Sequence, residues 1–420
     1  MIKLSRFFVI CLTIVILLSS FLFNIVSAAG EEIEITMWFG RNNFIPGDAF
    51  EQFHKEYPNI RVKTDVIRLE QSVADFIRAA GAGKAPDLLQ VPADSIGPLA
   101  QQGLLLDMTE LFNRWQKEDP ETYNGIAPLG WSMPKWDGIP YGVALHIGPY
   151  WYVYRKDLFE KAGISHPPKT WDDVLEAGRK LSVGDTIGFS IIGSREHDPV
   201  WFLSLFMAMG GQFENNVPQL NSEAGIYLLS FYQTLMRDKI ASSDTLAWNS
   251  GDMRAAFIGG NAAQSFIGDN IFPTIQEAMP WNEKWSAVPP LVRPGAESEG
   301  RYMALGWPYL VSANTKYPYE ASLVLRYLSR PEIISEVAMR YQPTTVVKVL
   351  NLPEYKEAKP WAPDFEGAFN QLVPLPAHGR QPAIYRYLLD AMQEALSNPN
   401  DDPAKIAQKY QDLIDKEASR

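Results

Sequence analysis

Aromatic and polar side chains that could together hold a hydroxylated molecule are the most visible chemistry in this sequence. The chain carries 12 Trp, 18 Tyr and 21 Phe residues. Trp and Tyr combine an apolar ring with a polar tip, so they suit pockets that are half apolar and half wet. A sugar presents apolar C–H faces to such rings, and its hydroxyls need Asp, Glu, Asn, Gln or Arg as partners. These hydrogen bonds provide specificity, because a buried polar group left without its partner is costly.

Candidates for such contacts stand at the ends of expected strands. Open α/β sheets bind ligands beyond the carboxyl ends of their strands. Trp38 and Arg41 stand at the end of the β-rich run 33–38, and Asp94 follows the short apolar run 88–91. We therefore predict that these three side chains contact a ligand.

Other site chemistries find little support in the sequence. Gly81-Ala82-Gly83-Lys84 lacks the spacing of a phosphate-binding loop, and the residues around Ser190 do not match a nucleophile elbow. The histidines show no spacing typical of metal ligands. We expect no cofactor, no metal and no catalytic residue. The five histidines are His54, His146, His166, His197 and His378.

Length and charge bound the class of protein. With 420 residues, 46% of them hydrophobic, the chain is long enough for two packed domains, since single cores stop growing near 250–300 residues. The formal net charge is −11. Such an acidic balance argues against nucleic acid as the main partner.

The first residues have the pattern of an export signal. Lys3 and Arg6 precede a long apolar stretch from Phe7 to Val26, and small residues follow it. This pattern predicts a signal peptide of residues 1–28. An uncleaved anchor is the alternative, because about 20 apolar residues can span a bilayer. The only cysteine, Cys11, lies in this segment, so the exported chain should have no thiol or disulfide.

Apolar spacing along the chain alternates between strand and helix patterns. Examples are an alternating strand at 60–66, a helix stripe at 73–80, a strand at 186–192 and two amphipathic helices near 384–396 and 404–416. Such alternation is typical of α/β domains with largely parallel sheets.

The segment from Tyr150 to Asp173 combines a strand, a helix, a stiff two-proline turn and a second helix. Asp157 can cap the first helix, and Gly163 suits the left-handed residue that ends it. Thr170 and Asp173 have capping-box spacing. The segment closely resembles the signature of bacterial extracellular solute-binding proteins of sugar-transporting ABC systems, the maltose-binding-protein-like family.

Further motifs in the family's order extend the resemblance over nearly the whole mature chain. They are a Phe-x-x-Gly-x-Ala turn at 257–263, a proline-rich strand exit at 287–291 and a return strand at 306–316. The resemblance implies an α/β fold, the type II two-lobe periplasmic-binding-protein fold. In it, mainly parallel sheets flanked by helices form each lobe and the ligand cleft lies between the lobes. The implied N-terminal lobe comprises residues 29–143 and 300–348, and the C-terminal lobe comprises residues 144–299 and 349–420.

The resemblance also adds candidates for ligand contact. Asp94 stands where the family often has a sugar-binding Asp, and Arg380 lies in a loop that often contacts ligand. Asn270 stands where the family commonly has Trp, so a usual stacking surface is replaced by an amide. The full set of predicted ligand-binding residues is Trp38, Arg41, Asp94, Tyr141, Tyr150, Trp248, Asp269, Asn270, Trp307 and Arg380.

The implied function is binding rather than catalysis. A monomeric protein in the periplasm, or on the outer face of the cytoplasmic membrane, would capture a sugar or oligosaccharide by hinge closure and deliver it to an ABC permease. Two alternatives remain open. The same fold could bind a polyol, a phosphorylated polyol, an anion or a peptide. A secreted carbohydrate-active enzyme also remains, because paired catalytic carboxylates have no fixed spacing in sequence.

Overall fold

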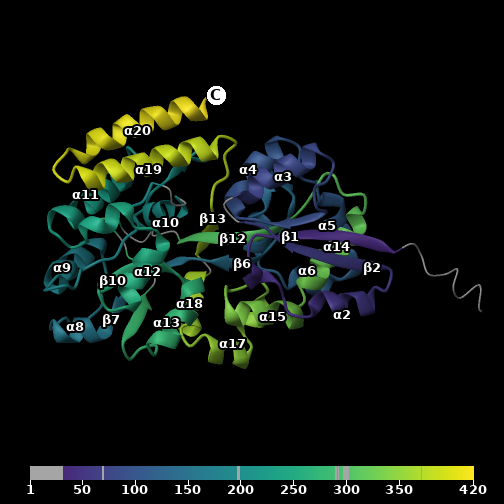
Figure 1. Cartoon of the computed structure of the whole chain (residues 1–420), viewed down its shortest axis with the longest axis horizontal. Helices are drawn as coiled ribbons and strands as arrows, with labels where there is room; N and C mark the ends of the chain where they lie inside the picture. Colours follow the sequence, from purple (N-terminus) through teal and green to yellow (C-terminus); the bar gives the residue numbers. More distant parts are fainter. Residues whose placement is uncertain are drawn as a thin grey trace, which may run out of the picture.

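The protein folds into two lobes, seen side by side in a computed structural model (Figure 1). The structure describes residues 32–68, 71–195, 199–288, 291, 293–296, 302–369 and 371–420. The predicted signal peptide, His197 and the Pro289-Pro290 strand exit lie outside these ranges. Three apolar clusters form the core. The largest fills the C-terminal lobe, and the other two fill the N-terminal lobe.

The N-terminal lobe is built on a sheet with the strand order β13-β12-β3-β1-β2, with β6 paired to β12. β1 runs parallel to β2 and β3, whereas β12 runs antiparallel to β3 and β6. Alternate residues of β1, Ile35, Met37 and Phe39, are buried, which is the period of a strand with one face on the core. The strands are β1 (Ile33–Phe39), β2 (Ile60–Val66), β3 (Leu88–Gln90), β6 (Gly142–Gly148), β12 (Tyr302–Val311) and β13 (Leu372–Pro374).

Helices cover both faces of this sheet. Pro at the first helical positions of α6, α7, α14, α15 and α17 suits helix starts, because the missing N–H has no partner there anyway. The helices are α2 (Ala49–Glu56), α3 (Ser72–Gly81), α4 (Ile96–Gln101), α5 (Thr109–Glu118), α6 (Pro120–Asn124), α7 (Pro128–Ser132), α14 (Pro318–Leu328), α15 (Pro331–Arg340), α16 (Val347–Leu350) and α17 (Pro353–Ala358). A hairpin of β4 (Lys135–Trp136) and β5 (Ile139–Pro140) completes the lobe.

The C-terminal lobe holds a smaller sheet with the order β10-β7-β11. The strands are β7 (Tyr150–Arg155), β10 (Gln264–Gly268) and β11 (Trp285–Val288). β7 runs antiparallel to both neighbours, so this sheet departs from the expected mainly parallel pairing. The reason is that β7 enters directly from β6 of the other lobe. The expected strand at 186–192 is also wrong, because this segment makes only the single bridges Ile187–Ala262 and Ser190–Ser265.

The helices of the C-terminal lobe surround one fully buried helix. All nine residues of α10 (Val200–Ala208) are buried, as expected for a helix that is apolar on every side. The others are α8 (Lys156–Lys161), α9 (Trp171–Leu181), α11 (Glu223–Arg237), α12 (Ser250–Ile258), α13 (Phe272–Ala278), α18 (Ala362–Phe369), α19 (Gln381–Ser397) and α20 (Pro403–Ala418). Short pieces are η4 (Ser243–Ala247), η5 (Asp269–Ile271) and the hairpin β8 (Phe213–Glu214) with β9 (Val217–Pro218).

The helix ends test the local predictions. Thr170 Oγ1 accepts a bond from the Asp173 N–H at 3.1 Å, and the Asp173 carboxylate accepts one from the Thr170 N–H at 2.9 Å, so the capping box is confirmed. Gly163 has the expected positive φ of 71°. The cap proposed for Asp157 is wrong. Helix α8 begins at Lys156, so Asp157 lies within its first turn, and the Asp157 carboxylate forms an ion pair with Arg155.

The chain crosses between the lobes three times. It leaves β6 for β7 after Gly148 and returns along β12. A third crossing follows α17, since Tyr355 packs in the N-terminal core and Trp361 in the C-terminal core. This packing favours a last boundary near Lys359, whereas the sequence places it at 348–349. In Figure 1, β6, β12 and β13 occupy the middle of the molecule between the two halves.

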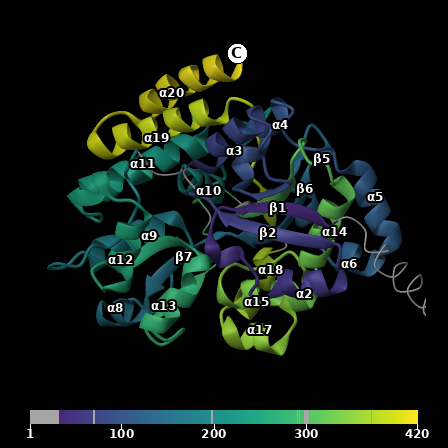
Figure 2. The same ribbon diagram turned by 45° about the vertical axis from the view of Figure 1, so that its right-hand side comes forward.

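The last two helices lie along the C-terminal lobe and reach the N-terminal lobe. α19 and α20 pack on each other and on α11. In Figures 1 and 2 the start of α19 and the end of α20 lie beside α4. Two close approaches occur there. A Cβ on Gly97 would stand 3.3 Å from the His378 carbonyl oxygen, and one on Gly379 would stand 2.3 Å from Gln101 Oε1.

Candidate functional site

The loop after β3 forms one wall of a space between the lobes. It contains η3 (Ala93–Ser95) and leads into α4, with Asp94 half-buried at its centre. A small apolar cluster supports this wall from below. Leu99 and Tyr141 are buried in that cluster, and the half-buried Trp38 packs against it. The loop that carries Asp94 at the end of the strand is therefore anchored on a buried apolar cluster.

A first hollow of about 280 Å³ lies between this wall and the start of α19. Asp94 lines it from the N-terminal lobe, whereas Arg195, Tyr385 and Arg386 line it from the C-terminal lobe. Gln381 also lines it, and the Gln381 side-chain amide donates a hydrogen bond to the Tyr385 hydroxyl. The remaining lining residues are Pro199, Pro382 and Leu389. The hollow thus joins a carboxylate, two guanidiniums, a phenol and an apolar floor.

A second hollow of about 490 Å³ adjoins the first at the start of α19. Trp136 and Gln101 line it from the N-terminal lobe, and His378, Arg380 and Arg420 line it from the opposite side. The consecutive residues Arg380 and Gln381 belong to the second and the first hollow, respectively. We call the two hollows together the groove.

Arg380 is tied to the end of α20 within the groove. Its Nε donates to Glu417 Oε1 at 2.9 Å, and Arg420 Nη1 donates to Glu417 Oε2 at 2.9 Å. The hydrogen bond from Arg380 holds the pKa of Glu417 below its usual range. Burial, with a smaller contribution from Arg380, lowers the pKa of His378, which is therefore neutral at pH 7.

Trp307 lies in a separate aromatic cluster. The register of β12 shifts between Gly306 and Pro308, a bulge that redirects the Trp307 ring. The ring centroid lies 5.1 Å from that of Phe44, and the Arg41 guanidinium carbon lies 5.5 Å from the Trp307 centroid. Arg41 is exposed, Trp307 is half-buried and Phe44 is buried. The predicted pair Arg41 and Trp307 therefore meet, although they are 266 positions apart.

The aromatic cluster continues to the C-terminal lobe. Phe44 lies 5.2 Å from Tyr341, and Asn270 Nδ2 donates to the Tyr341 hydroxyl at 3.4 Å. Asn270 belongs to η5, directly after β10. The amide at position 270 therefore contacts the other lobe.

The crossing segments meet at Gly148. This residue pairs with Leu305 of β12. A Cβ on Gly148 would stand 2.6 Å from Asp269 Oδ1 and 2.6 Å from Gln342 Nε2, so only glycine leaves room for these two groups. Both Asp269 oxygens are buried, and the Trp151 side chain and the Asn270 N–H act on the carboxyl group as donors without forming well-aligned hydrogen bonds. We call Gly148, Asp269, Gln342 and Lys359 the junction.

The junction holds two buried ionisable groups. Burial raises the pKa of Asp269 to about 8, and the nearby Lys359 opposes that rise. Burial likewise lowers the pKa of Lys359 to about 8, opposed by Asp269. Lys359 Nζ also donates to the Tyr341 carbonyl oxygen at 2.8 Å. Charge is therefore costly here unless both groups remain together.

The ten predicted residues do not share a single pocket. Asp94 and Arg380 line the groove, and Trp38 and Tyr141 support its wall. Arg41, Asn270 and Trp307 belong to the aromatic cluster, and Asp269 belongs to the junction. Tyr150 stacks on Phe266, with centroids 5.6 Å apart, and the Trp248 carbonyl accepts bonds from the Gly193 and Ser194 N–H groups.

Sequence reasoning missed most of the groove. It did not single out Arg195, Tyr385 or Arg386. The helix predicted near 384–396 could have suggested Tyr385 and Arg386, because both stand in its first turns, close to the predicted contact Arg380. Lys359 gave no signal in sequence, because its partner Asp269 is 90 positions away.

Metal-binding clusters and membrane-spanning helices are both absent from the described part of the chain. No group of three or more His, Cys, Asp or Glu residues in it could hold a metal ion. In the same residues, no helix is long and apolar enough to cross a membrane.

Comparison with known proteins gives the same architecture. The family model for bacterial extracellular solute-binding proteins matches residues 42–333. Among curated relatives, the maltotriose-binding protein of Pyrococcus abyssi is 22% identical over 395 residues, which cover 91% of this chain and 82% of the relative.

Solved structures superpose over most of the chain. The sugar-binding protein MalE from Xanthomonas citri has a TM-score of 0.78 at 19% identity, covering 92% of this chain and 97% of that one. A solute-binding protein from Thermotoga lettingae, bound with α-D-tagatose, has a TM-score of 0.75 at 21% identity. That match covers 92% of this chain and 100% of the other. At these identities the matches establish the two-lobe fold.

Proposed function

The chain belongs to the bacterial extracellular solute-binding protein family of ABC transporters, and on that premise we propose that it captures a sugar or oligosaccharide in the groove and delivers it to an ABC permease. One observation carries the proposal. The first hollow places Asp94 of one lobe opposite Arg195 and Tyr385 of the other, so a single small molecule could contact both lobes.

The chemistry of the groove suits a hydroxylated ligand. Carboxylate, guanidinium and phenol groups can pair with hydroxyls, and Trp136 in the second hollow offers a flat apolar face. The relatives named above bind maltotriose and tagatose, and these printed ligands support a saccharide here. Asp94, Arg380 and the newly identified Arg195, Tyr385 and Arg386 are the contacts we propose. The aromatic cluster of Arg41, Asn270 and Trp307 remains a second proposed contact region.

The proposed mechanism is closure of the lobes about the three crossings. A ligand that touches both lobes binds the closed state better than the open one, and it shifts the population by that difference in affinity. Hinge closure in periplasmic binding proteins is a well-described form of such motion. The junction lies where the crossings meet, so its packing would set how easily the lobes separate.

Export fits this role. The predicted signal peptide of residues 1–28 would carry the protein across the cytoplasmic membrane, where a solute-binding protein meets both ligand and permease. Intact mass of the protein from its host tests this step. We expect the chain to begin at Ala29.

A thermal-shift screen of the mature chain against mono- and oligosaccharides tests the binding proposal, followed by calorimetric titration of every hit. We expect at least one saccharide to raise the melting temperature and to bind with one-to-one stoichiometry. Asp94→Ala should weaken that binding at least tenfold, about 1.4 kcal/mol, while the variant remains folded. Turnover of an oligosaccharide under the same conditions would instead support the secreted enzyme.

A further inference from the structure

We propose that the captured solute carries an anionic group, a carboxylate or a phosphate, on its hydroxylated skeleton, and that Arg386 binds this group. The inference rests on the proposed function, because it concerns the ligand of the same groove. It goes beyond that function by specifying the charge of the solute and the residue that binds the charged group.

The groove differs in charge from the rest of the molecule. The whole chain has a formal net charge of −11. Nevertheless, four guanidiniums line the two hollows, and Asp94 is the only carboxylate among the described lining residues. The four are Arg195, Arg380, Arg386 and Arg420. A cationic site in an acidic protein concentrates anions locally, although the overall field repels them.

Three of the four arginines form ion pairs, although two of them share one carboxylate. Arg195 forms an ion pair with Asp390, and Arg380 and Arg420 share the single carboxylate of Glu417. Four positive charges therefore face three carboxylates, namely Asp94, Asp390 and Glu417. One positive charge remains in excess, and a ligand anion would balance it.

Arg386 is the arginine with a free guanidinium. It forms no ion pair among the described residues, and its guanidinium carbon lies 5.3 Å from the ring centroid of its neighbour Tyr387. Its side chain is exposed at the rim of the first hollow. Guanidinium groups present a planar fork of N–H donors that matches carboxylate and phosphate oxygens bidentately. An anion here would meet a guanidinium that forms no ion pair with a described carboxylate, although the charge of Arg386 also acts on Glu417.

The surroundings of Arg386 suit the remainder of such a molecule. Tyr385 and Gln381 are fixed to each other by a hydrogen bond, so their orientation is set before ligand arrives. Asp94 on the opposite wall can accept bonds from hydroxyls. The hollow of about 280 Å³ is near the lower end of the range for small-molecule sites, which suits one sugar-sized unit. A longer saccharide could continue into the second hollow.

Calorimetric titration of the mature chain with charge-matched probes tests the inference. Glucuronate and galacturonate, with their oligomers, represent the carboxylates, and glucose 6-phosphate and glycerol 3-phosphate represent the phosphates. Glucose, galactose, glycerol and maltotriose are the neutral counterparts. We expect at least one anionic probe to bind tenfold or more tightly than its neutral counterpart, and this preference to shrink as salt rises from 20 to 300 mM. Comparison of the carboxylate probes with the phosphate probes identifies which anionic group the protein binds.

Arg386→Gln is the decisive variant, because it keeps polarity and removes charge at an exposed position. It should lose at least tenfold in affinity for the anionic probe and a clearly smaller factor for neutral sugars, for which the guanidinium is only a hydrogen-bond donor. Arg179→Gln, an exposed arginine on α9 outside the groove, is the matched control and should bind like the parent. Neutral sugars that bind as well as or better than every anionic probe would overturn the inference and leave the proposed function standing. If no saccharide or acid binds, the proposed function itself fails.

Discussion

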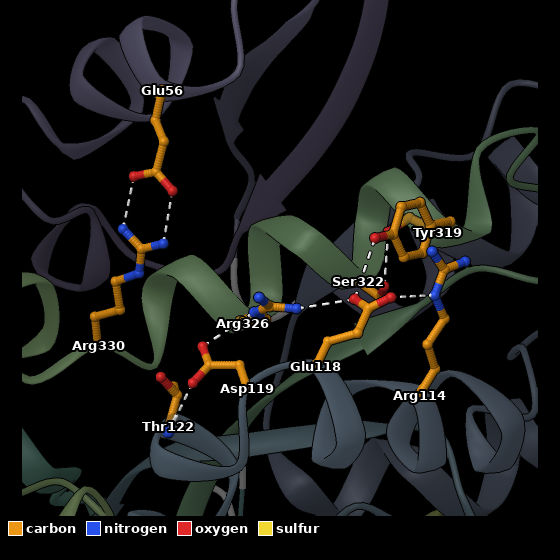
Figure 3. Close-up of polar contacts among 9 residues, drawn as sticks. All are labelled: Glu56, Arg114, Glu118, Asp119, Thr122, Tyr319, Ser322, Arg326 and Arg330. Carbon is orange, nitrogen blue, oxygen red and sulfur yellow. Dashed lines mark hydrogen bonds and ion pairs between the residues drawn. The ribbon is translucent and has the colours of Figure 1, made fainter.

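The junction and the surface of α14 both contain paired ionisable groups, yet they treat charge in opposite ways. Around α14, carboxylates and guanidiniums remain near water and form paired or shared ion pairs (Figure 3). At the junction, Asp269 and Lys359 are buried, and the donors near the Asp269 oxygens do not form well-aligned hydrogen bonds. The contrast indicates that the N-terminal lobe is fixed as one body, whereas the packing and protonation of the junction can change.

The α14 network fastens helices of one lobe to one another. Arg326 reaches Glu118 at 3.1 Å and Asp119 at 3.0 Å, at the end of α5 and before α6. Arg330 forms two bonds of 2.7 Å with Glu56 of α2, as Figure 3 shows. Because every element in this network belongs to the N-terminal lobe, it stabilises the lobe as one body and has no role between lobes.

The junction joins segments that belong to different lobes. Asp269 follows β10 of the C-terminal lobe, whereas Gly148 and Lys359 lie on crossings. Burial without full hydrogen bonding raises the free energy of this arrangement, so a small change in protonation or packing there can shift the balance between lobe positions.

Lys359→Ala should lower the free energy of unfolding by about 3 kcal/mol. The Tyr341 carbonyl loses its buried donor, and the Asp269 carboxyl group loses the only buried ammonium beside it. Urea denaturation at pH 7 measures the loss. The double variant Asp269→Asn with Lys359→Met should recover part of it. A loss below about 1 kcal/mol for the single variant would show that the junction is no more sensitive than a surface pair.

Gly148→Ala should cost about 2 kcal/mol, because the added methyl meets Asp269 Oδ1 and Gln342 Nε2 at 2.6 Å. Gly81→Ala is the matched control. A Cβ there meets nothing within 4 Å, so that variant should be neutral or slightly more stable. Thermal melts of the two variants in parallel give the comparison. Equal melting temperatures would contradict tight packing at the junction.

Asp269→Asn should change how stability depends on pH. The pKa of Asp269 in the folded protein, about 8, exceeds its ordinary value near 3.9. Its stabilising contribution is therefore full at low pH and is lost as pH rises through 8. Asn imitates the protonated acid but does not titrate. The free energy of unfolding of the variant, relative to that of the parent, should therefore rise between pH 5 and 8. Urea midpoints across that range give the trend, and parallel curves would contradict the raised pKa.

Arg326→Gln should cost less than about 1 kcal/mol, although it removes two ion pairs. Partly solvated pairs contribute about 0.2–1 kcal/mol each, and Glu118 retains Arg114 and Tyr319 as partners. Urea denaturation at low and high salt checks both the size and the screening of the effect. A loss comparable to that of Lys359→Ala would remove the contrast between the two regions.

The sequence predicted local structure well where the signal is local. The capping box at Thr170 and the two closing amphipathic helices were expected and are present. The turn at Gly260, with a φ of 84°, was also expected. In each case residues within a few positions determine the backbone. The expected strand at 186–192 failed because a strand needs a partner along its length, and neighbouring segments provide only isolated bridges.

The candidate site was predicted only in part, for the same physical reason. Asp94 could be placed because strand ends in α/β sheets mark ligand sites. Arg386 could not be selected, because an exposed arginine on an amphipathic helix resembles any other until the opposite wall is known. The pairing of Asp269 with Lys359 depends on how two distant crossings meet, and no local pattern encodes that contact.

A solute held between the lobes should draw them together, and a distance between the lobes measures this closure. The single cysteine lies in the predicted signal peptide, so Glu110→Cys on α5 and Glu160→Cys on α8, both at exposed positions, would label one lobe each in the exported protein. With a spin label on each cysteine, pulsed electron–electron double resonance gives the distribution of distances between the labels, with and without a saturating ligand from the calorimetric screen. We expect a shift to one shorter, narrower distribution. An unchanged distribution with ligand bound would contradict it.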